Sequence, residues 1–489
     1  MESLPPRSRS ELPPPPGPRG LPIIGSLHKL PPNANHIDFV RFARPYGDIC
    51  RFRIGSVRTV MLAHPDLIVE AFGKPEINER HRLEVFTCLS EHEGLIYSSY
   101  GDHWRNVSQV AREKLWSAGD VAAICQPHFE YTADEMRARM VRAAEEGMLV
   151  DDPVKVLFSS NYSLALRTLF GLETDYDDEF RRNKEALERH IAWFDAAASS
   201  TGNLADVFHW LKVIPSKMLR ESRRQRASRD RILTALVDSV ARHRAGNRSD
   251  GPRCMVDVLL ALEDAGEIGR GAINALCMDV LGAVPAGLAA TVSWFLLLMA
   301  NRPEAQARVH EEIDRVVGRD RPAGADDRKN LPYTFACVAE SMRFRTIAPF
   351  GIPHRTTQET EVGGYRIPAN MQVFGSIYSV HHDPRFWESP DEFLPERFLP
   401  ETEGSLPAAL GSPAYMPFGR GNRVCTGDHY AMAAFWTYAV RLMQHLRFET
   451  PGGEPLSEEE KWGLSVSPVP HDLKVVRRHG SGPGGGLRG

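Results

Sequence analysis

The chain has 489 residues, of which 42% are hydrophobic and 25% charged, and its formal net charge is −4. It is long enough for one large domain or for two to three ordinary ones. The charge gives no electrostatic reason to expect nucleic acid as a partner, and seven scattered cysteines without a Cys-x-x-Cys pair argue against a disulfide framework or a zinc site.

The two ends of the chain differ in composition from the rest. Residues 1–11 are polar and hold no apolar stretch that could be a signal peptide or an anchor, so we expect no transmembrane anchor in this sequence. Prolines crowd the next segment, and 1–20 is interpreted as a proline-rich hinge. Residues 479–489 are mostly glycine and basic, which predicts a disordered tail. Between them, 21–478 shows no repeat and no linker, as expected of a single domain.

The pattern of apolar residues predicts a mainly α protein with a small β portion. Most of the chain between 64 and 345 has apolar residues at helical intervals of three and four. Clear helical examples are 132–146, 179–198, 227–244 and 303–317. Short strands are predicted at 49–53, 59–62, 361–367 and 371–378.

The segment 273–300 is almost uniformly apolar and long enough to suggest a transmembrane helix. It nevertheless contains Asn274, Asp279 and Pro285, and neither end has the aromatic and basic border of a membrane span. A helix that is apolar on all sides is equally expected through the centre of a large globular protein.

The most informative segment is Phe418-Gly-Arg-Gly-Asn-Arg-Val-Cys-Thr-Gly427, which places Cys425 in a loop crowded with glycine and arginine. A thiolate there would face two arginines and the start of a helix, both of which favour negative charge. The glycines remove side-chain bulk, so that something large and flat could lie against the backbone. These are the surroundings that a metal-bound thiolate needs; the alternative is a buried structural cysteine in a turn.

The spacing F-x-x-G-x-R-x-C-x-G resembles the heme-binding signature of the cytochrome P450 family, with every fixed position filled through Gly427. The resemblance implies the cytochrome P450 fold, with heme b between a long central helix, here 273–300, and the Cys-bearing loop. It implies that Cys425 is the axial thiolate on the heme iron. It also implies that Arg423 pairs with a heme propionate and that Phe418 packs beside the sulfur.

A second motif of the family is Glu340-Ser-Met-Arg343, whose charged ends lie one helical turn apart. The resemblance implies a buried triad that takes its third member from Pro395-Glu-Arg-Phe398, beneath the heme loop. The alternative is an ordinary surface ion pair, which contributes almost nothing to stability.

The resemblance further implies that Trp104 and His354 contact heme propionates. Trp104 opens a helix-like segment that runs to Leu115, but Ser108 stands where the family has a second, arginine contact. His354 lies in a Pro-His-Arg segment, and a structural histidine is the alternative at this position.

The oxygen-binding pattern of the family, A/G-G-x-D/E-T, falls on Ala283-Val-Pro-Ala-Gly287 in the central helix. Ala283, Ala286 and Gly287 therefore occupy catalytic positions, but Ala286 and Gly287 replace the acid and the alcohol that help deliver protons. A register shifted by three residues does not restore the pair. Pro285 is expected to kink this helix and open a groove.

The implied function is a heme-thiolate monooxygenase that inserts one oxygen atom from O2 into a nonpolar or aromatic small molecule. No flavin or nicotinamide segment is visible, so electrons must come from an NADPH-dependent reductase or another redox partner. Its docking site could be the basic patch, which consists of Arg105, Arg112, Lys114 and Arg420, although a solvated face is equally expected. Because the acid–alcohol pair is missing, an isomerase, dehydratase or peroxygenase is the main alternative, and a non-catalytic heme sensor or an inactive protein remains open.

The substrate pocket is expected to be lined by small apolar residues and three phenylalanines, Phe86, Phe194 and Phe350. By resemblance it draws on 84–95, the helix around 193–194, positions 283 and 287, 347–352 and 465–469. The protein is expected in the cytoplasm or peripherally associated with the endoplasmic reticulum, with a peripheral membrane contact as an open alternative.

Overall fold

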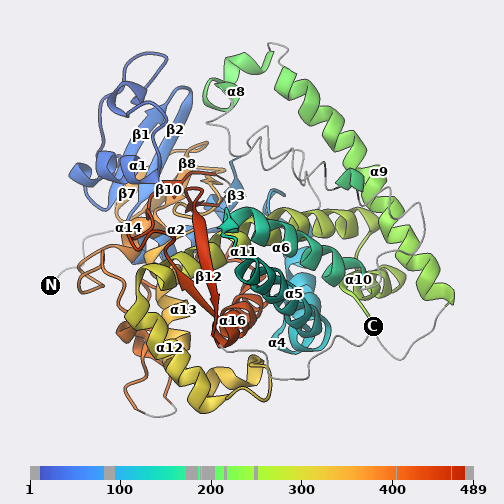
Figure 1. The fold of residues 1–489 in the computed structure, drawn as a ribbon. Coiled ribbons are helices and arrows are strands. Elements are labelled where there is room, and N and C mark those ends of the chain that lie inside the picture. The colour runs from blue at the N-terminus through green and yellow to red at the C-terminus, as the bar shows by residue number, and fades with distance from the viewer. Residues whose placement is uncertain are drawn as a thin grey trace.

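The computed structural model describes residues 12–81, 94–171, 185–187, 189, 204–213, 217–246, 252–402, 405–463 and 465–478. Helices dominate this part of the chain (Figure 1). Strands gather at the upper left of the view, where N-terminal strands (blue) lie beside strands from the second half of the chain (orange), and a C-terminal strand (red) crosses the middle of the molecule. The predicted mainly α fold with a small β portion is confirmed. The predicted tail and nearly all of the predicted helix 179–198 lie outside the described residues.

The described helices agree with the apolar spacing, although several begin earlier than the pattern indicates. The predicted helices 132–146, 227–244 and 303–317 are confirmed. The first and third end one residue earlier than predicted, and the second lies inside a longer helix. Prolines begin several of them, where the missing N–H has no helical partner to lose. The α-helices are α1 (His36–Ala43), α2 (Pro65–Gly73), α3 (Asp102–Val110), α4 (Ala118–Asp120), α5 (Gln126–Glu145), α6 (Pro153–Phe170), α8 (Leu204–Val207), α9 (Lys217–Gly246), α10 (Met255–Asp264), α11 (Arg270–Asn301), α12 (Pro303–Val316), α13 (Pro332–Phe344), α14 (Ile377–His381), α15 (Ala408–Gly411) and α16 (Asp428–His445).

The strands form one five-stranded sheet, in the order β1-β2-β8-β5-β3, and three smaller sheets, β4-β12-β9, β10-β11 and β6-β7. β1 and β2 are an antiparallel hairpin, and β2 pairs with β8 in parallel. The strands are β1 (Ile49–Ile54), β2 (Val57–Leu62), β3 (Glu79–Arg80), β4 (Val150–Asp151), β5 (His354–Arg355), β6 (Thr360–Val362), β7 (Tyr365–Ile367), β8 (Gln372–Gly375), β9 (Leu446–Glu449), β10 (Glu460–Lys461), β11 (Ser467–Pro468) and β12 (Asp472–Arg477).

Two predicted strands differ from the structure. The segment 361–367 is a hairpin of β6 and β7, because Gly363 and Gly364 both take positive φ angles, 57° and 77°, and turn the chain back. The segment 371–378 ends as a strand at Gly375. Ser376 then accepts a hydrogen bond from the Ser379 backbone N–H, which caps the start of α14.

The apolar segment 273–300 lies within α11, a 32-residue helix that packs against α6 and α16. Among the described helices it alone is long and apolar enough to cross a membrane, but 72% of its most apolar window is buried inside the protein. Its interpretation as a core helix follows from this burial. Pro285 is buried within α11, and the backbone stays helical across it, so the expected kink does not interrupt the helix.

Candidate functional site

Cys425 lies in a tightly turned loop just before α16. Its backbone N–H donates to the carbonyl oxygen of Phe418 at 3.0 Å, and the N–H of Gly419 donates to the carbonyl of Met416 at 2.9 Å. Gly421 takes a φ of 83°, and a Cβ there would lie 2.5 Å from the backbone oxygen of Phe72 in α2. Only glycine therefore allows the loop to approach α2 this closely.

The Cys425 thiol is accessible and yet surrounded by protein. The residue is exposed to a water-sized molecule. Desolvation by surrounding atoms nevertheless raises its pKa to about 11, against a smaller lowering effect of the backbone hydrogen bond from Gly427. The exposed fraction and the desolvation describe different things: a water-sized molecule reaches the residue, while many protein atoms surround its sulfur. The thiol is neutral at pH 7 unless a bound cation takes its proton's place.

The two arginines of the loop do not face the sulfur, which corrects the expectation from sequence. Arg420 donates to the backbone oxygen of Tyr415 at 2.7 Å. Arg423 is buried and donates to the backbone oxygens of Asn78, Leu95 and Ser98 at 3.1, 2.9 and 2.7 Å. These acceptors are distant in sequence, so local spacing could not reveal them.

Arg423 belongs to a buried group of donors that includes Trp104. The guanidinium lies 4.3 Å from the centre of the Trp104 ring. The Trp104 indole N–H donates at 3.0 Å to the Leu95 oxygen, which Arg423 also uses. Burial lowers the pKa of Arg423 to about 9, and the positive charge of Arg80 lowers it further.

Arg80 is a member of this group that the sequence analysis missed. It is buried at the end of β3 and donates to the backbone oxygens of Ile96 and Ile352 at 3.0 and 2.9 Å. Burial lowers its pKa to about 10. No motif marks this arginine, because its partners come from distant parts of the chain.

His354 is buried beside the same two arginines. Its Nδ1 lies 3.0 Å from the Ile77 backbone oxygen, and its ring stacks on Phe72 with 3.9 Å between the centres. Burial lowers its pKa well below the usual value, and the charges of Arg80 and Arg423 lower it further. The imidazole is therefore neutral at pH 7, with Nδ1 as its donor to Ile77. The structure thus brings Trp104, His354 and Arg423 together.

The middle of α11 presents accessible surface where the oxygen-binding pattern was placed. Ala283 is exposed and Ala286 and Gly287 are partly exposed, although most of the helix is buried. None of the three carries an acid or an alcohol. The hydroxyl of Thr291, one turn further along, donates to the Gly287 backbone oxygen at 2.9 Å.

Glu340 and Arg343 form a fully buried ion pair within α13. Two guanidinium nitrogens of Arg343 donate to the two Glu340 carboxylate oxygens at 2.7 and 2.8 Å. Arg397 is the third member of the predicted triad and lies 3.4 Å from the same carboxylate. Glu396, its neighbour, pairs instead with the exposed Arg308.

His381 connects this triad to the Cys-bearing loop. Arg343 donates to the His381 backbone oxygen at 2.6 Å, and the His381 Nε2 accepts the backbone N–H of Met416 at 3.0 Å. Met416 directly precedes the first turn of the loop, so the fixed guanidinium positions the loop through a single histidine. The Tyr415 hydroxyl adds a second tie, since it donates to the Ala339 backbone oxygen at 3.2 Å.

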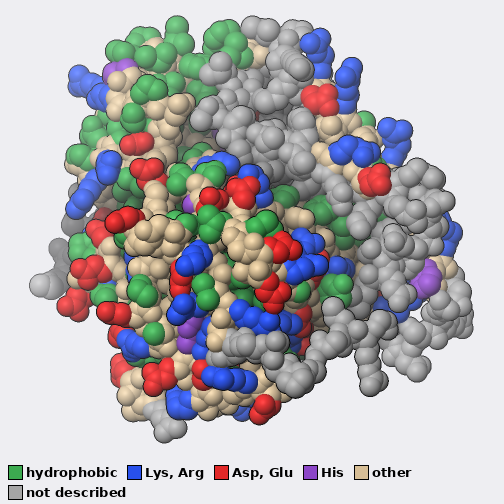
Figure 2. Space-filling model, viewed as in Figure 1, with side chains coloured by type: hydrophobic (Ala, Val, Ile, Leu, Met, Phe, Trp, Pro, Cys, Tyr) green, Lys and Arg blue, Asp and Glu red, His purple; other side chains and the backbone are tan. Residues whose placement is uncertain are grey.

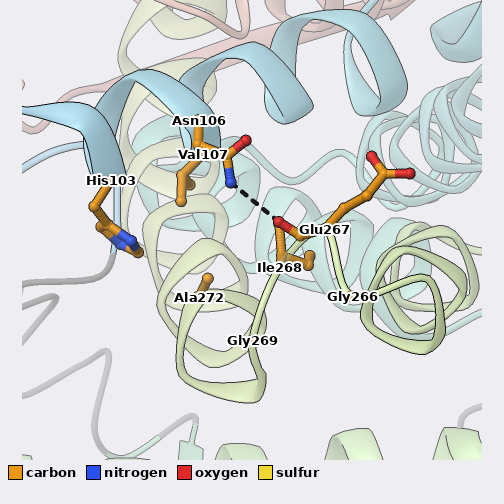
Figure 3. A pocket seen from close by; sticks show the side chains of 8 residues that line it. All are labelled: His103, Asn106, Val107, Gly266, Glu267, Ile268, Gly269 and Ala272. Carbon is orange, nitrogen blue, oxygen red and sulfur yellow. Dashed lines mark hydrogen bonds between the residues drawn. The ribbon is translucent and has the colours of Figure 1, made fainter.

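Of the expected substrate-pocket residues, Phe350 has another role. It stacks on Phe374 at 5.0 Å between centres and packs in a small core with Cys50, Phe52 and Met61. Phe86 and Phe194 lie outside the described residues. A separate hollow of about 330 Å³ lies between α3 and the turn before α11, where the Asn106 amide donates to the Glu267 backbone oxygen at 3.0 Å (Figure 3). It contains none of the predicted site residues.

The sequence matches the family model described as Cytochrome P450 over residues 15–475. It is 31% identical over 483 residues to cytochrome P450 1B1 of Homo sapiens, with 95% of this chain and 87% of the relative covered. It is 28% identical over 493 residues to cytochrome P450 2U1 of Rattus norvegicus, and 29% identical over 479 residues to cytochrome P450 1A2 of Cavia porcellus. Both comparisons cover 95% of this chain and 91% of the relative.

Proposed function

Because this chain belongs to the cytochrome P450 family and is therefore a heme b-dependent monooxygenase, we propose that Cys425 is the residue whose sulfur would hold the heme iron. The observation that carries this assignment is that Cys425, in the glycine-turned loop before α16, is exposed, whereas the other five cysteines that the structure describes are buried. Bound iron would take the place of the thiol proton and keep the sulfur as a thiolate. The Gly427 backbone N–H would then stabilise the negative sulfur.

The donors beside the loop fit the two propionates of heme b. Arg80 and Arg423 are buried cations, and their five hydrogen bonds to described residues all go to uncharged backbone oxygens. Two guanidinium groups buried close together raise the free energy of the protein unless an anion offsets them. The N–H groups of Trp104 and His354 are already donated to Leu95 and Ile77, so the two guanidinium groups would supply the charge-assisted hydrogen bonds to a propionate pair.

When bound, heme supplies the iron at which O2 is activated for insertion of one oxygen atom into the substrate. The chain's own residues hold and enclose that group. Phe418 forms the start of the loop behind Cys425, and Gly419 and Gly421 let the loop turn. Ala283, Ala286 and Gly287 would border the substrate, and their small side chains leave room for it.

We expect the substrate to be a nonpolar or aromatic small molecule. The accessible residues of α11 between 283 and 287 are Ala283, Val284, Ala286 and Gly287, none of which offers a side-chain hydrogen bond. Binding there would depend chiefly on the exclusion of water from apolar surface. A charged substrate would lose its hydration without a partner along this stretch.

The expected electron donor is a separate reductase that uses NADPH and docks at the basic patch. Arg105, Arg112 and Lys114 are exposed, and Arg112 donates to the Asn422 backbone oxygen at 3.3 Å, next to the Cys-bearing loop. Arg420 is only partly exposed and contributes less. A partner with an acidic face would be attracted to this side, and the attraction would weaken with salt.

A peripheral contact with the endoplasmic reticulum membrane is supported by exposed apolar side chains of the N-terminal lobe, which consists of α1, β1, β2 and the residues before them, and of the segment after α8. Leu21, Ile23 and Trp210 are 48%, 69% and 57% exposed. The turn at Gly55 and Ser56 joins their two segments, through hydrogen bonds to the backbone oxygens of Ile24 and Val207. Hydrophobic side chains gather over this lobe, and basic ones follow α9 (Figure 2). Such a surface suits an anionic lipid bilayer.

The test of the ligand assignment is the absorption spectrum of the reduced protein with carbon monoxide. A thiolate ligand gives a Soret band shifted far to the red, and this band should disappear in Cys425→Ala. The matched control is Cys50→Ala, which removes a buried cysteine of the N-terminal lobe and should leave the band in place. A histidine-type band in the unaltered protein, or a red-shifted band in Cys425→Ala, would contradict the assignment.

A further inference from the structure

The first residue of α1, His36, is fully buried and lies among the rings of three other residues. The centre of its imidazole ring is 4.7 Å from that of Tyr378 in α14 and 5.4 Å from that of Trp462, on which it stacks. Phe350 lies edge-on to it at 6.5 Å. These four residues, the aromatic cluster, join α1 of the N-terminal lobe to segments from the second half of the chain, and α1, α14 and β10 lie together at the left of the view (Figure 1).

A buried carboxylate faces the imidazole of His36. Nε2 of His36 lies 3.0 Å from Oε2 of Glu460, and the two side chains are only 1% and 8% exposed. Neither imidazole nitrogen has a hydrogen bond to any other described residue. Among the described residues, the other cation within ion-pair distance of Glu460 is Arg345, at 3.7 Å. Because a buried carboxylate raises the free energy of the protein unless polar groups offset it, the contact with His36 helps to determine where Glu460 lies.

Glu460 is the first residue of β10, which pairs with β11 in a hairpin that reaches α11. The backbone N–H of Val466, just before β11, donates to the Ile347 oxygen at 2.8 Å. The Val466 oxygen accepts the indole N–H of Trp294 in α11 at 3.1 Å. The hairpin therefore lies against α11 and the segment after α13, which are two of the parts of the chain that we expect to form the substrate pocket.

The segment 347–352 also contacts the aromatic cluster directly. The backbone N–H of Tyr378 donates to the Pro349 oxygen at 3.1 Å, and the ring centre of Trp462 is 6.2 Å from that of Phe350. Both predicted pocket segments, the one after α13 and the one that contains β11, are thus held by contacts that meet at the first turn of α1.

We propose that His36 is a positioning residue for the substrate, whose contact with Glu460 holds the β10–β11 hairpin in place and so sets how tightly the site binds a large apolar ligand. This inference rests on the proposed function, because 347–352 and 465–469 must face the substrate. Without the imidazole, Glu460 would be left with Arg345 and would turn toward it or toward water, and the hairpin that begins at Glu460 would shift. His36 itself transfers no proton and does not touch the substrate.

The alternative is that His36 contributes to stability alone, so that its removal lowers the unfolding midpoint and leaves ligand affinity unchanged. Two azoles that bind heme iron through the same type of nitrogen separate these cases. Imidazole is small and stays near the iron, whereas clotrimazole carries three aryl rings that must fit the walls of the pocket. The Soret shift of the purified, heme-loaded protein measures both dissociation constants.

His36→Ala should raise the dissociation constant of clotrimazole about tenfold, because a loosened hairpin has to be ordered on binding, and should leave that of imidazole unchanged. His36→Gln keeps a polar N–H group beside Glu460 and should bind clotrimazole within about twofold of the unaltered protein. The matched control is His310→Ala, which removes a buried histidine of α12 whose Nε2 lies 3.1 Å from the Leu446 oxygen. It should leave both dissociation constants unchanged.

Glu460→Ala tests the same contact from its other side, and it decides the question if His36→Ala does not fold. Arg345 keeps Glu458 as its partner in this variant. Glu460→Ala should weaken the binding of clotrimazole alone, and the double variant should weaken it no more than the stronger single variant, since both changes remove one contact.

If His36→Ala and Glu460→Ala bind clotrimazole as tightly as the unaltered protein does, or weaken the binding of both azoles in equal proportion, the positioning role is refuted and the proposed function stands. If the unaltered protein lacks the red-shifted Soret band with carbon monoxide and neither azole shifts its spectrum, the proposed function itself has failed.

Discussion

Arg343 and His381 are linked by hydrogen bonds along two routes, one direct and one through Thr346. The Arg343 guanidinium donates to the His381 backbone oxygen at 2.6 Å, and the Thr346 hydroxyl, which donates to the Arg343 carbonyl at 3.2 Å, lies 2.8 Å from His381 Nδ1. Since His381 also holds the Met416 backbone, the triad on α13 and the Cys-bearing loop form one network. The loop is thus positioned by a buried charge rather than by its own glycines alone.

The first prediction is that Arg343→Met abolishes the heme-bound fold. The change leaves Glu340 buried with Arg397 and the Leu394 backbone N–H as its remaining partners, and it removes the donor to His381. Breaking a buried pair on one side costs about 3–5 kcal/mol, a large share of the stability of a domain. The yield of protein with a red-shifted carbon monoxide band measures the effect.

Its control is Arg308→Met, which removes an arginine whose side chain is 51% exposed in its pair with Glu396. Such a pair contributes at most about 1 kcal/mol, so heme binding should persist. Equal yields from the two variants would show that burial of the triad does not matter for the loop.

The sequence predicts the features that are local in the chain. The loop from Phe418 to Gly427 and the helical pair Glu340 and Arg343 are recognisable because their residues are a few positions apart. The directions in which side chains point are a different matter. Arg423 was expected to face the sulfur, but its acceptors include the carbonyl of Asn78, 345 residues away.

The residues that the sequence analysis missed or misplaced depend on packing between distant segments. Arg80 joins the site only because β3 pairs with β5, which carries His354. Phe350 was assigned to the pocket, yet Phe374 of β8 and Phe39 of α1 enclose it. Composition and spacing carry no information on these contacts, because they arise only when segments far apart in the sequence pack together.

The second prediction concerns pH. His381 is fully buried, and burial lowers its pKa well below the usual value, followed by the charges of His382, Arg343 and Arg420. Above about pH 6.5, His381 is neutral in both the folded and the unfolded protein. Below that pH it takes up a proton in the unfolded chain but stays neutral in the folded protein. Stability should therefore fall as the pH drops below about 6.5, by up to about 1.4 kcal/mol per pH unit for this histidine.

Urea midpoints at pH 7.5 and 5.5, followed by far-ultraviolet circular dichroism, measure this loss. His381→Gln should be less stable at pH 7.5 and should lose less between the two values. His429→Gln, at an exposed position, should lose as much as the unaltered protein. If His381→Gln and the unaltered protein lose the same amount, His381 does not control the pH dependence.

The third prediction is that Gly421→Ala destabilises the Cys-bearing loop. Alanine would have to adopt a φ of 83°, with its Cβ 2.5 Å from the Phe72 backbone oxygen. The left-handed conformation alone costs about 1–2 kcal/mol, and the contact adds to it. Gly411→Ala is the control, because a Cβ there meets nothing within 4 Å and φ is not positive. Thermal unfolding should show a lower midpoint for the first variant only; equal midpoints would exclude close loop packing against α2.

The fourth prediction tests the membrane surface at Ile23, a β-branched residue that is 69% exposed with a φ of 63°. This conformation is strained for isoleucine and easier for asparagine, so Ile23→Asn should keep or raise the stability of the protein. Together with Trp210→Ala it should nevertheless reduce sedimentation with vesicles of phosphatidylcholine and phosphatidylserine at least severalfold, because apolar contact area is lost. Leu406→Asn, at an 84% exposed position before α15, is the control and should bind vesicles normally. Unchanged binding of the double variant would mean that the membrane contact, if formed, uses another surface.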